Sequence, residues 1–447
     1  MAKTFIIKIA KAVVFVLALI SLNFAQSGKI DSAAAAAQVT EFEVNGLKVL
    51  VKRRPLSPTV AAALFIRGGA RNIDEKNAGL EDLTLKSAIE AGKKYTRQAV
   101  RREISQTGSA IGATAGQDFS VVSMGATRAN FERIWDIFTD VLLNPTFAID
   151  DIERNRRSTL SILAEKDVSP EGALESEIER VMYAGHPYAN DTGGTPTTIN
   201  SFKAADLIAY HKKIMETSRL LLVFVGDLDA NELKTRIVAS FGKLPRGDYK
   251  EQPFPTLNFT KPSLDIVARP GIPTNYVEGV FNAPSLKDDD YYPMQVAISI
   301  LQQLVFQEVR IKRLLSYAPA AEMNNLAANT ANISVSSTDA NQSVSLMLEQ
   351  INNLRRQTLT DEVVSEVAGN FLTTYYLGQD TSAAQVGELA RYELIGGGWR
   401  HSFEFLDRIR QVRPIDVQAV SEKYMRNLRF VVVGNPAQIK RSIFLPN

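Results

Sequence analysis

The side chains that most often bind metals or attack substrates are scarce in this sequence. It contains no cysteine, which excludes disulfides, thiolate zinc sites and cysteine nucleophiles. Its three histidines, His186, His211 and His401, lie far apart in the chain and form no pair at helical spacing. Surface or interface positions are expected for His211 and His401. A histidine-based catalytic or metal site is therefore not indicated by the residues alone.

Arg310 and Tyr317 are better candidates for chemistry, and they lie seven positions apart within "VFQEVRIKRLLSYAPAA". A tyrosine hydroxyl can donate a hydrogen bond to an oxyanion, and a guanidinium can clamp a backbone carbonyl. Both groups stabilise charge that develops during peptide hydrolysis. Seven residues are nearly two helical turns, so both side chains can face one side. The simpler alternatives are an ion pair of Arg310 with Glu308 or another acidic group, and a core position for Tyr317.

A second candidate segment, "AGLEDLTLKSAIEAG", has the apolar spacing of an amphipathic helix. Asp82 and Lys86 stand at i and i+4, the spacing of an ordinary helical ion pair worth about 0.2 to 0.5 kcal/mol. Glu81, Glu90 and Glu165 could offer further oxygen ligands. They do not make a zinc peptidase site, because such sites need nitrogen donors and no histidine is near.

The elements that must position these residues follow helix and strand periods in turn. Helices are expected over 80–91, 97–107, 130–143 and 150–165, and strands over 48–52, 59–66, 120–125 and 220–225. "SRLLLVFVGDLDANEL" and "NLRFVVVGNPAQI" each give an apolar strand, a glycine turn and a helix start. This repeat predicts an α+β protein of two duplicated α/β-sandwich domains, each a largely antiparallel sheet packed with helices.

The domain boundaries follow from composition. An N-terminal domain is expected over 38–245 and a C-terminal domain over 263–447, joined by a linker, 246–262, that is rich in proline, glycine and charge. Basic residues precede a short apolar run near the N-terminus, which predicts a signal peptide over 1–25 and export, most simply to a periplasm. A mitochondrial presequence is the less favoured alternative. The net charge of +2 gives no general attraction for nucleic acid, so no nucleic-acid partner is expected.

The order and spacing of four segments resemble the insulinase/pitrilysin family of zinc peptidases, particularly the branch containing mitochondrial processing peptidase and the short bacterial members. The family's motif helix, Gly-Leu-x-His-x-x-Glu-His in active members, is resembled by "IRGGARNIDEKNAGLEDLTLKSAIEAG". The helix with its third zinc ligand is similar to "FAIDDIERNRRSTLSILAEKDVSPEGAL", and its Gly-His-Pro segment to "AGHPYANDTGGTPTTINSF". The stretch Phe-Gln-Glu-x-Arg-x-x-x-Gly-Leu-x-Tyr resembles "VFQEVRIKRLLSYAPAA".

This resemblance implies that the zinc site has been lost. It places Asp82 and Lys86 at the two histidine positions of the motif, Leu85 at the general base and Ile162 at the third ligand. An ammonium group repels Zn²⁺, and leucine and isoleucine have no donor atom. No metal or other cofactor is therefore expected in this chain, and the ion pair between Asp82 and Lys86 is expected in place of the metal.

By the same resemblance, the first half has lost the family's zinc ligands, whereas the second half keeps the family's substrate-binding residues. The resemblance matches Arg310 and Tyr317 to the arginine and tyrosine with which the family's second domain holds the substrate near the metal. Leu314 departs from the family's usual glycine, and Gly112 replaces the asparagine common in the edge strand that carries extended substrate. The likeness also implies a structural turn, not catalysis, for His186.

Two functions remain open on this basis. The first is a non-catalytic subunit, forming half of a clamshell, whose Arg310 and Tyr317 complete the site of a homologous zinc-bearing partner that hydrolyses peptides or unfolded proteins. The second is a catalytically dead peptide-binding or scaffolding protein, like the core subunits of respiratory complexes with this fold. In either case the chain alone is not expected to be an enzyme.

Overall fold

The computed structural model describes residues 32–445. Residues 32–38 contain one short helix, α2 (Ser32–Ala36), and the chain from Val39 onward forms one compact unit. The predicted signal peptide lies outside the described residues. Within the described part of the chain, no helix is both long and apolar enough to cross a bilayer.

The first half of the unit contains a six-stranded sheet in the order β1-β2-β6-β3-β5-β4. The pair β2–β6 is parallel and the other pairs are antiparallel. Its strands are β1 (Val39–Val44), β2 (Leu47–Arg53), β3 (Thr59–Arg67), β4 (Ala110–Thr114), β5 (Phe119–Thr127) and β6 (Leu220–Gly226). Its helices are α3 (Leu80–Ala88), α4 (Arg97–Thr107), α5 (Phe131–Leu143), α6 (Ile149–Val168), α7 (Pro170–Met182), α8 (Pro196–Ser201), α9 (Ala204–Ile214) and α10 (Ala230–Ala239).

The second half repeats this plan with a five-stranded sheet in the order β7-β11-β8-β10-β9. Here β11 and β7 are the parallel pair. Its strands are β7 (Ser263–Ala268), β8 (Asn275–Asn282), β9 (Ala320–Met323), β10 (Thr330–Ser337) and β11 (Arg429–Gly434). Its helices are α11 (Tyr291–Val305), a π-helical turn (Phe306–Ile311), α12 (Ala340–Arg356), α13 (Asp361–Gly378), α14 (Ser382–Ile395), α15 (His401–Arg410), α16 (Pro414–Tyr424) and α17 (Arg441–Phe444).

The two sheets confirm the predicted α+β class and the duplication. Strands β6 and β11, which carry the repeated apolar stretches, occupy equivalent positions beside a parallel and an antiparallel neighbour. Strand β6 is fully buried along its length because helices cover both faces of the sheet around it, which explains its uninterrupted run of apolar residues.

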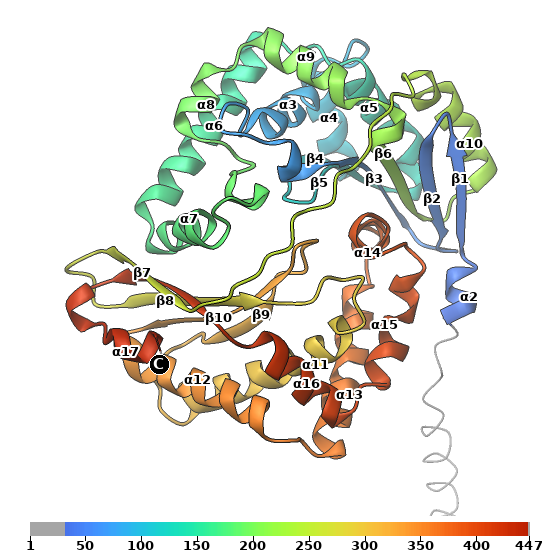
Figure 1. Ribbon diagram of the computed structural model, residues 1–447. Coiled ribbons are helices and arrows are strands. Elements are labelled where there is room, and N and C mark those ends of the chain that lie inside the picture. Colours follow the sequence, from blue (N-terminus) through green and yellow to red (C-terminus); the bar gives the residue numbers. More distant parts are fainter. Residues whose placement is uncertain (1–31, 446–447) are drawn as a thin grey trace, which may run out of the picture. The chain divides into compact units, whose positions relative to one another are not determined.

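The two halves exchange one helix each (Figure 1). Helix α7 of the first half packs on strands β8 and β11 of the second sheet, and helix α14 of the second half packs on β3 and β6 of the first sheet. Hydrogen bonds also join the halves: the amide nitrogen of Ala327 donates to Asp118 at 3.0 Å, and the amide nitrogen of Ala328 donates to the Tyr188 hydroxyl at 3.2 Å. These contacts explain why the whole chain from Val39 behaves as one unit.

The segment between the sheets, 246–262, has neither helix nor strand. It is nevertheless fixed along the surface of the unit. Glu251 forms ion pairs with Arg67 and Arg71, and the ring of Phe254 stacks on His186 with centroids 5.7 Å apart. The segment therefore acts as a packed strap between the halves, and the exact domain boundaries remain a prediction.

Candidate functional site

Helix α3, the counterpart of the zinc-motif helix, begins after a glycine that no other residue can replace without strain. Gly79 has a φ of 82°, and a β-carbon there would lie 2.8 Å from the carbonyl oxygen of Gly193 and from the Cα of Gly194. Only glycine combines this left-handed conformation with so close an approach of two backbones. Gly79 therefore fixes the backbone at the start of α3.

The expected ion pair forms on this helix. Lys86 Nζ lies 2.6 Å from Asp82 Oδ2, and the other carboxylate oxygen accepts a hydrogen bond of 3.3 Å from the amide of Ala115, just beyond edge strand β4. The Asp82 side chain is 6% exposed and the Lys86 side chain 35%. Both carboxylate oxygens of Asp82 are therefore already engaged, one with the Lys86 ammonium group and the other with the amide that follows strand β4.

The other two motif positions point to different environments. Leu85 is fully buried in the apolar core beneath the first sheet, so a carboxylate at its position would lie among apolar side chains in this chain. Ile162 lies on α6 with 58% of its surface exposed. Among residues 32–445, no group of three or more His, Asp or Glu is placed to hold a metal ion. The residues present at these positions do not fit zinc.

The carboxylates that might have formed a shifted metal site have structural partners or face solvent. Glu81 is buried, accepts hydrogen bonds from Ser120 and from Tyr210 at 2.6 Å, and lies 3.5 Å from Arg219. Burial and the neighbouring carboxylate raise the pKa of Tyr210. Glu90 pairs with arginines of α4, and Glu165 is exposed on α6.

Arg310 and Tyr317 come together in the second half. Arg310 Cζ lies 3.9 Å from the centroid of the Tyr317 ring, a cation–π contact, and the Tyr317 side chain is 78% exposed. Glu308 pairs with Lys312 at 2.5 Å and with Arg313, so the alternative of an ion pair between Glu308 and Arg310 is wrong. The alternative of a core position for Tyr317 is also wrong.

The stacked pair of Arg310 and Tyr317 lies on a segment of irregular backbone. Arg310 lies in the π-helical turn Phe306–Ile311, a type of helix that occurs mostly as short insertions, frequently at functional sites. Leu314, where the resemblance leads one to expect glycine, has a φ of 54° and is 81% exposed. The loop thus keeps the left-handed conformation that glycine would adopt easily, at the cost of strain on a leucine.

Two of the three histidines, His186 and His211, lie in buried structural environments. His186 Nδ1 accepts a hydrogen bond from the amide of Tyr188, and its Nε2 lies 3.1 Å from the carbonyl oxygen of Pro255, as expected for a turn histidine. Burial lowers the pKa of His186. The prediction of a surface position for His211 is wrong: it is buried, and its Nε2 lies 2.9 Å from the carbonyl oxygen of Leu142. The helix that carries His211, α9, packs on the core of the first half, and this burial is not evident from the local sequence.

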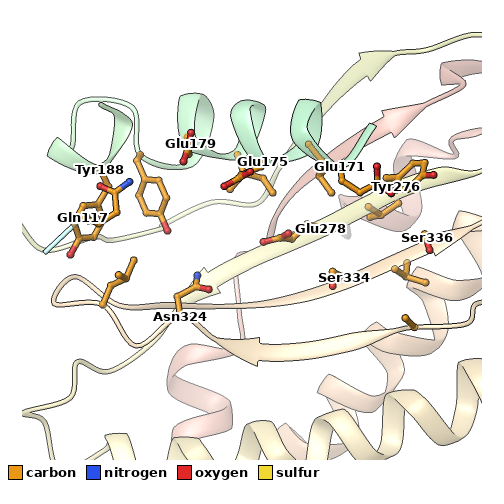
Figure 2. A pocket seen from close by; sticks show the side chains of 17 residues that line it. Gln117, Glu171, Glu175, Glu179, Tyr188, Tyr276, Glu278, Asn324, Ser334 and Ser336 are labelled. Atoms are coloured by element: carbon orange, nitrogen blue, oxygen red, sulfur yellow. The ribbon is translucent and has the colours of Figure 1, made fainter. Parts of the chain in front are cut away.

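A cleft of about 580 Å³ was not predicted from the sequence. It lies between helix α7 and the second sheet, and Ala318, which follows Tyr317 in the chain, is among its lining residues. Figure 2 shows the carboxylates of α7 on one wall and Glu278 of β8 on the other. Glu171, Glu175 and Glu179 stand at i, i+4 and i+8, a visible spacing in the sequence that predicts one acidic helix face.

Comparison with known proteins identifies the fold's family. Residues 48–196 match the family model described as "Insulinase (Peptidase family M16)", and residues 201–370 match "Peptidase M16 inactive domain". Together the two models account for most of the chain. This protein belongs to the M16 family.

Proteins similar to this chain have different described roles. An uncharacterized zinc protease of Mycobacterium tuberculosis is 24% identical over 432 residues, covering 92% of this chain and 96% of that protein. Mitochondrial-processing peptidase subunit beta of Blastocladiella emersonii is 24% identical over 268 residues, covering 59% and 56%. Cytochrome b-c1 complex subunit 1 of Bos taurus is 24% identical over 267 residues, covering 59% and 55%.

A solved structure supports the same fold. The peptidase M16 inactive domain from Pseudomonas fluorescens superposes with a TM-score of 0.81 at 19% identity, covering 89% of this chain and 98% of that one. This M16 chain therefore has the family's architecture, while the positions that the sequence resemblance matches to the zinc site carry an ion pair and apolar side chains.

Proposed function

We propose that this chain is a non-catalytic subunit that completes the active site of a homologous, zinc-bearing M16 peptidase. The observation that carries the proposal is the exposed stack of Arg310 on Tyr317. The chain makes no other use of these two side chains: within the described residues, Arg310 forms no ion pair and the Tyr317 hydroxyl has no hydrogen bond.

The chemistry of the pair suits a role beside a metal in another chain. In a partner with an intact His-x-x-Glu-His helix, zinc and the motif glutamate would activate the water that attacks the peptide bond. Arg310 would bind a substrate carbonyl and orient it, and the Tyr317 hydroxyl would donate a hydrogen bond to the oxygen on which negative charge develops. The substrate would be an extended peptide or unfolded protein, and this chain would supply no metal ligand.

Mixing two purified chains tests this proposal directly. The partner is a homologue with an intact zinc motif, and the readout is cleavage of a quenched peptide. We expect activity only in the mixture. Tyr317→Phe and Arg310→Ala should each lower kcat by about 10²- to 10³-fold, the range for loss of one transition-state donor. Arg313→Ala, which removes an arginine from the same loop but outside the stack, is the matched control.

Three outcomes would reject the proposal. Full activity of the zinc-bearing chain on its own would show that this subunit is not needed. Unchanged kcat in Tyr317→Phe and Arg310→Ala would assign no chemical role to the pair. An equal loss in Arg313→Ala would show that the loop matters only for its overall charge or folding.

A scaffolding or peptide-binding role is the second candidate. It is favoured by the similarity to a subunit of the bovine cytochrome b-c1 complex, which is named for an assembly and not for a protease. In that role Arg310 and Tyr317 would lack a chemical function, and the mixture would form a complex without gaining peptidase activity. Export to a periplasm, predicted from residues 1–25, is compatible with both candidates.

A further inference from the structure

The cleft between α7 and the second sheet brings carboxylates of like charge onto both of its walls. Glu171, Glu175 and Glu179 project from one face of α7, and Glu278 projects from β8 on the opposite wall. Within the part of the chain that is described, Glu278 makes no hydrogen bond and no ion pair, although its side chain is partly buried. Carboxylates that share a partly buried cleft repel each other when ionised, so this arrangement favours protonated forms.

The charged groups around the cleft do not neutralise this repulsion. Lys166 of α6 lies 3.7 Å from Glu175 and 3.3 Å from Glu179 of α7, and 3.4 Å from Asp191, so its charge is shared among three carboxylates. Arg429 of β11 lies on the same face of the sheet but its guanidinium covers the ring of Phe259. The acidic groups that face the cleft or border it are Glu171, Glu175, Glu179, Asp191, Asp265, Glu278 and Glu322, with the phenol of Tyr183 beside them.

The pseudo-equivalent helix shows that a gap at this place is not required by the fold. Helix α14, which covers the first sheet as α7 covers the second, has seven buried residues, and Ser382 donates a hydrogen bond of 3.3 Å to the carbonyl oxygen of Thr59. Helix α7 has three buried residues, Gly172, Ile178 and Met182. The acidic face is thus a feature of α7 itself. Helix α7 is held in place mainly by apolar contacts near its C-terminal end.

We propose that this cleft is a pH-sensitive latch, in which protonated Glu179 and Glu278 hold α7 against the second sheet and their ionisation releases the N-terminal half of the helix. Release would widen the cleft next to Ala318. The latch is a property of the isolated chain and does not depend on the proposed role as a peptidase subunit.

The titration of both groups falls in a physiological range. Burial, followed by the neighbouring Asp191, raises the pKa of Glu179 to about 7, against the opposing effect of Lys166. Burial, followed by Glu322 and Glu175, raises the pKa of Glu278 to about 7. A carboxyl whose pKa is higher in the closed form than in the open form stabilises the closed form at low pH. That advantage is lost as the pH rises from about 4.5 to about 7.

Hydrogen exchange of the full-length chain as a function of pH tests the latch. Protection factors, corrected for the intrinsic pH dependence of exchange, would be measured for α7 and, as an internal reference, for α5. One carboxyl with a pKa of about 7 when closed and about 4.5 when open predicts an about 30-fold fall in protection of α7 between about pH 5.5 and pH 8.5. Helix α5 should show no comparable fall.

Variants separate the latch from general effects. Glu179→Gln/Glu278→Gln should make the protection of α7 independent of pH within about threefold, and Glu278→Gln alone should give an intermediate slope. Glu165→Gln, which removes an exposed carboxylate of α6 outside the cleft, should behave like the unmodified chain. A pH-independent α7 in the unmodified chain, an equal fall in α5, or an unchanged slope in the double variant would overturn the proposal.

Discussion

The ion pair that stands at the zinc-motif positions makes the sharpest prediction, through the substitution Lys86→Met. Methionine keeps the length and much of the volume of lysine but leaves the Asp82 carboxylate with a single donor, the amide of Ala115 at 3.3 Å. Breaking a fully buried pair costs about 3 to 5 kcal/mol. Because Lys86 is about one-third exposed and water can partly replace it, we expect a loss of about 1 to 3 kcal/mol in the free energy of unfolding.

A double-mutant cycle isolates the pair from its neighbours. Asp82→Asn/Lys86→Met removes both charges and should lie within about 1 kcal/mol of the unmodified chain. The loss in this double variant should therefore be smaller than the sum of the losses in Asp82→Asn and Lys86→Met, and the difference is the coupling energy. Urea unfolding followed by tryptophan fluorescence is the assay. In a Trp399→Phe background, Trp135 reports on the core of the first half alone, because it packs against Phe138 and Phe224 there.

The surface pair of Lys94 and Asp136 provides the control. Its charged atoms lie 3.5 Å apart with both side chains more than half exposed, so Lys94→Met should cost less than about 0.5 kcal/mol. A cost for Lys86→Met no greater than that of Lys94→Met would refute the argument that a structural ion pair has taken the place of the metal. Stoichiometric binding of zinc by the Lys86→Met chain would refute it as well.

Two further substitutions test the second-half loop and the contact between the halves. Leu314→Gly should stabilise the chain by about 0.5 to 1 kcal/mol, because relief of about 1 to 2 kcal/mol of left-handed strain exceeds the roughly 0.5 to 1 kcal/mol of added unfolded-state entropy. Leu314→Ala should be nearly neutral. Denaturant titration of the two variants measures the difference in their free energies of unfolding. Tyr188→Phe removes the hydroxyl bonded to Asp118 and Ala328, so the same titration should show a loss of about 1 to 3 kcal/mol, and a loss below about 0.5 kcal/mol would contradict this role.

Local sequence patterns predicted the elements well wherever one face of the element meets a core. Helix α4 begins and ends at the expected residues, Arg97 and Thr107, because Thr96 caps its first turn and Gly108 ends it in a left-handed conformation. Strand β6 was evident because a central strand buried on both faces must be apolar throughout. The helix expected over 80–91 ends three residues earlier, at Ala88.

What the sequence did not predict depends on contacts between distant segments. The exchange of α7 and α14 between the sheets leaves no local signal, because an apolar helix face does not specify which sheet it covers. His211 was misplaced for the same reason, since its partner Leu142 is remote in sequence. The glutamate stripe of α7 was visible, but an acidic helix face is usually solvated, and only the packing of β8 beneath it turns the stripe into a cleft wall.

The two candidate sites of this chain stand in opposite relation to solvent, and this contrast bears on its function. Asp82 and Leu85 are buried and satisfied by their own surroundings, so the first site needs nothing from outside. Leu314 and Tyr317 are exposed on a strained loop, where they contribute little to the stability of the free chain. Strain and exposed apolar surface persist most readily where a second molecule makes use of them. This contrast supports the proposal that the second half offers Arg310 and Tyr317 to a site completed with a partner chain.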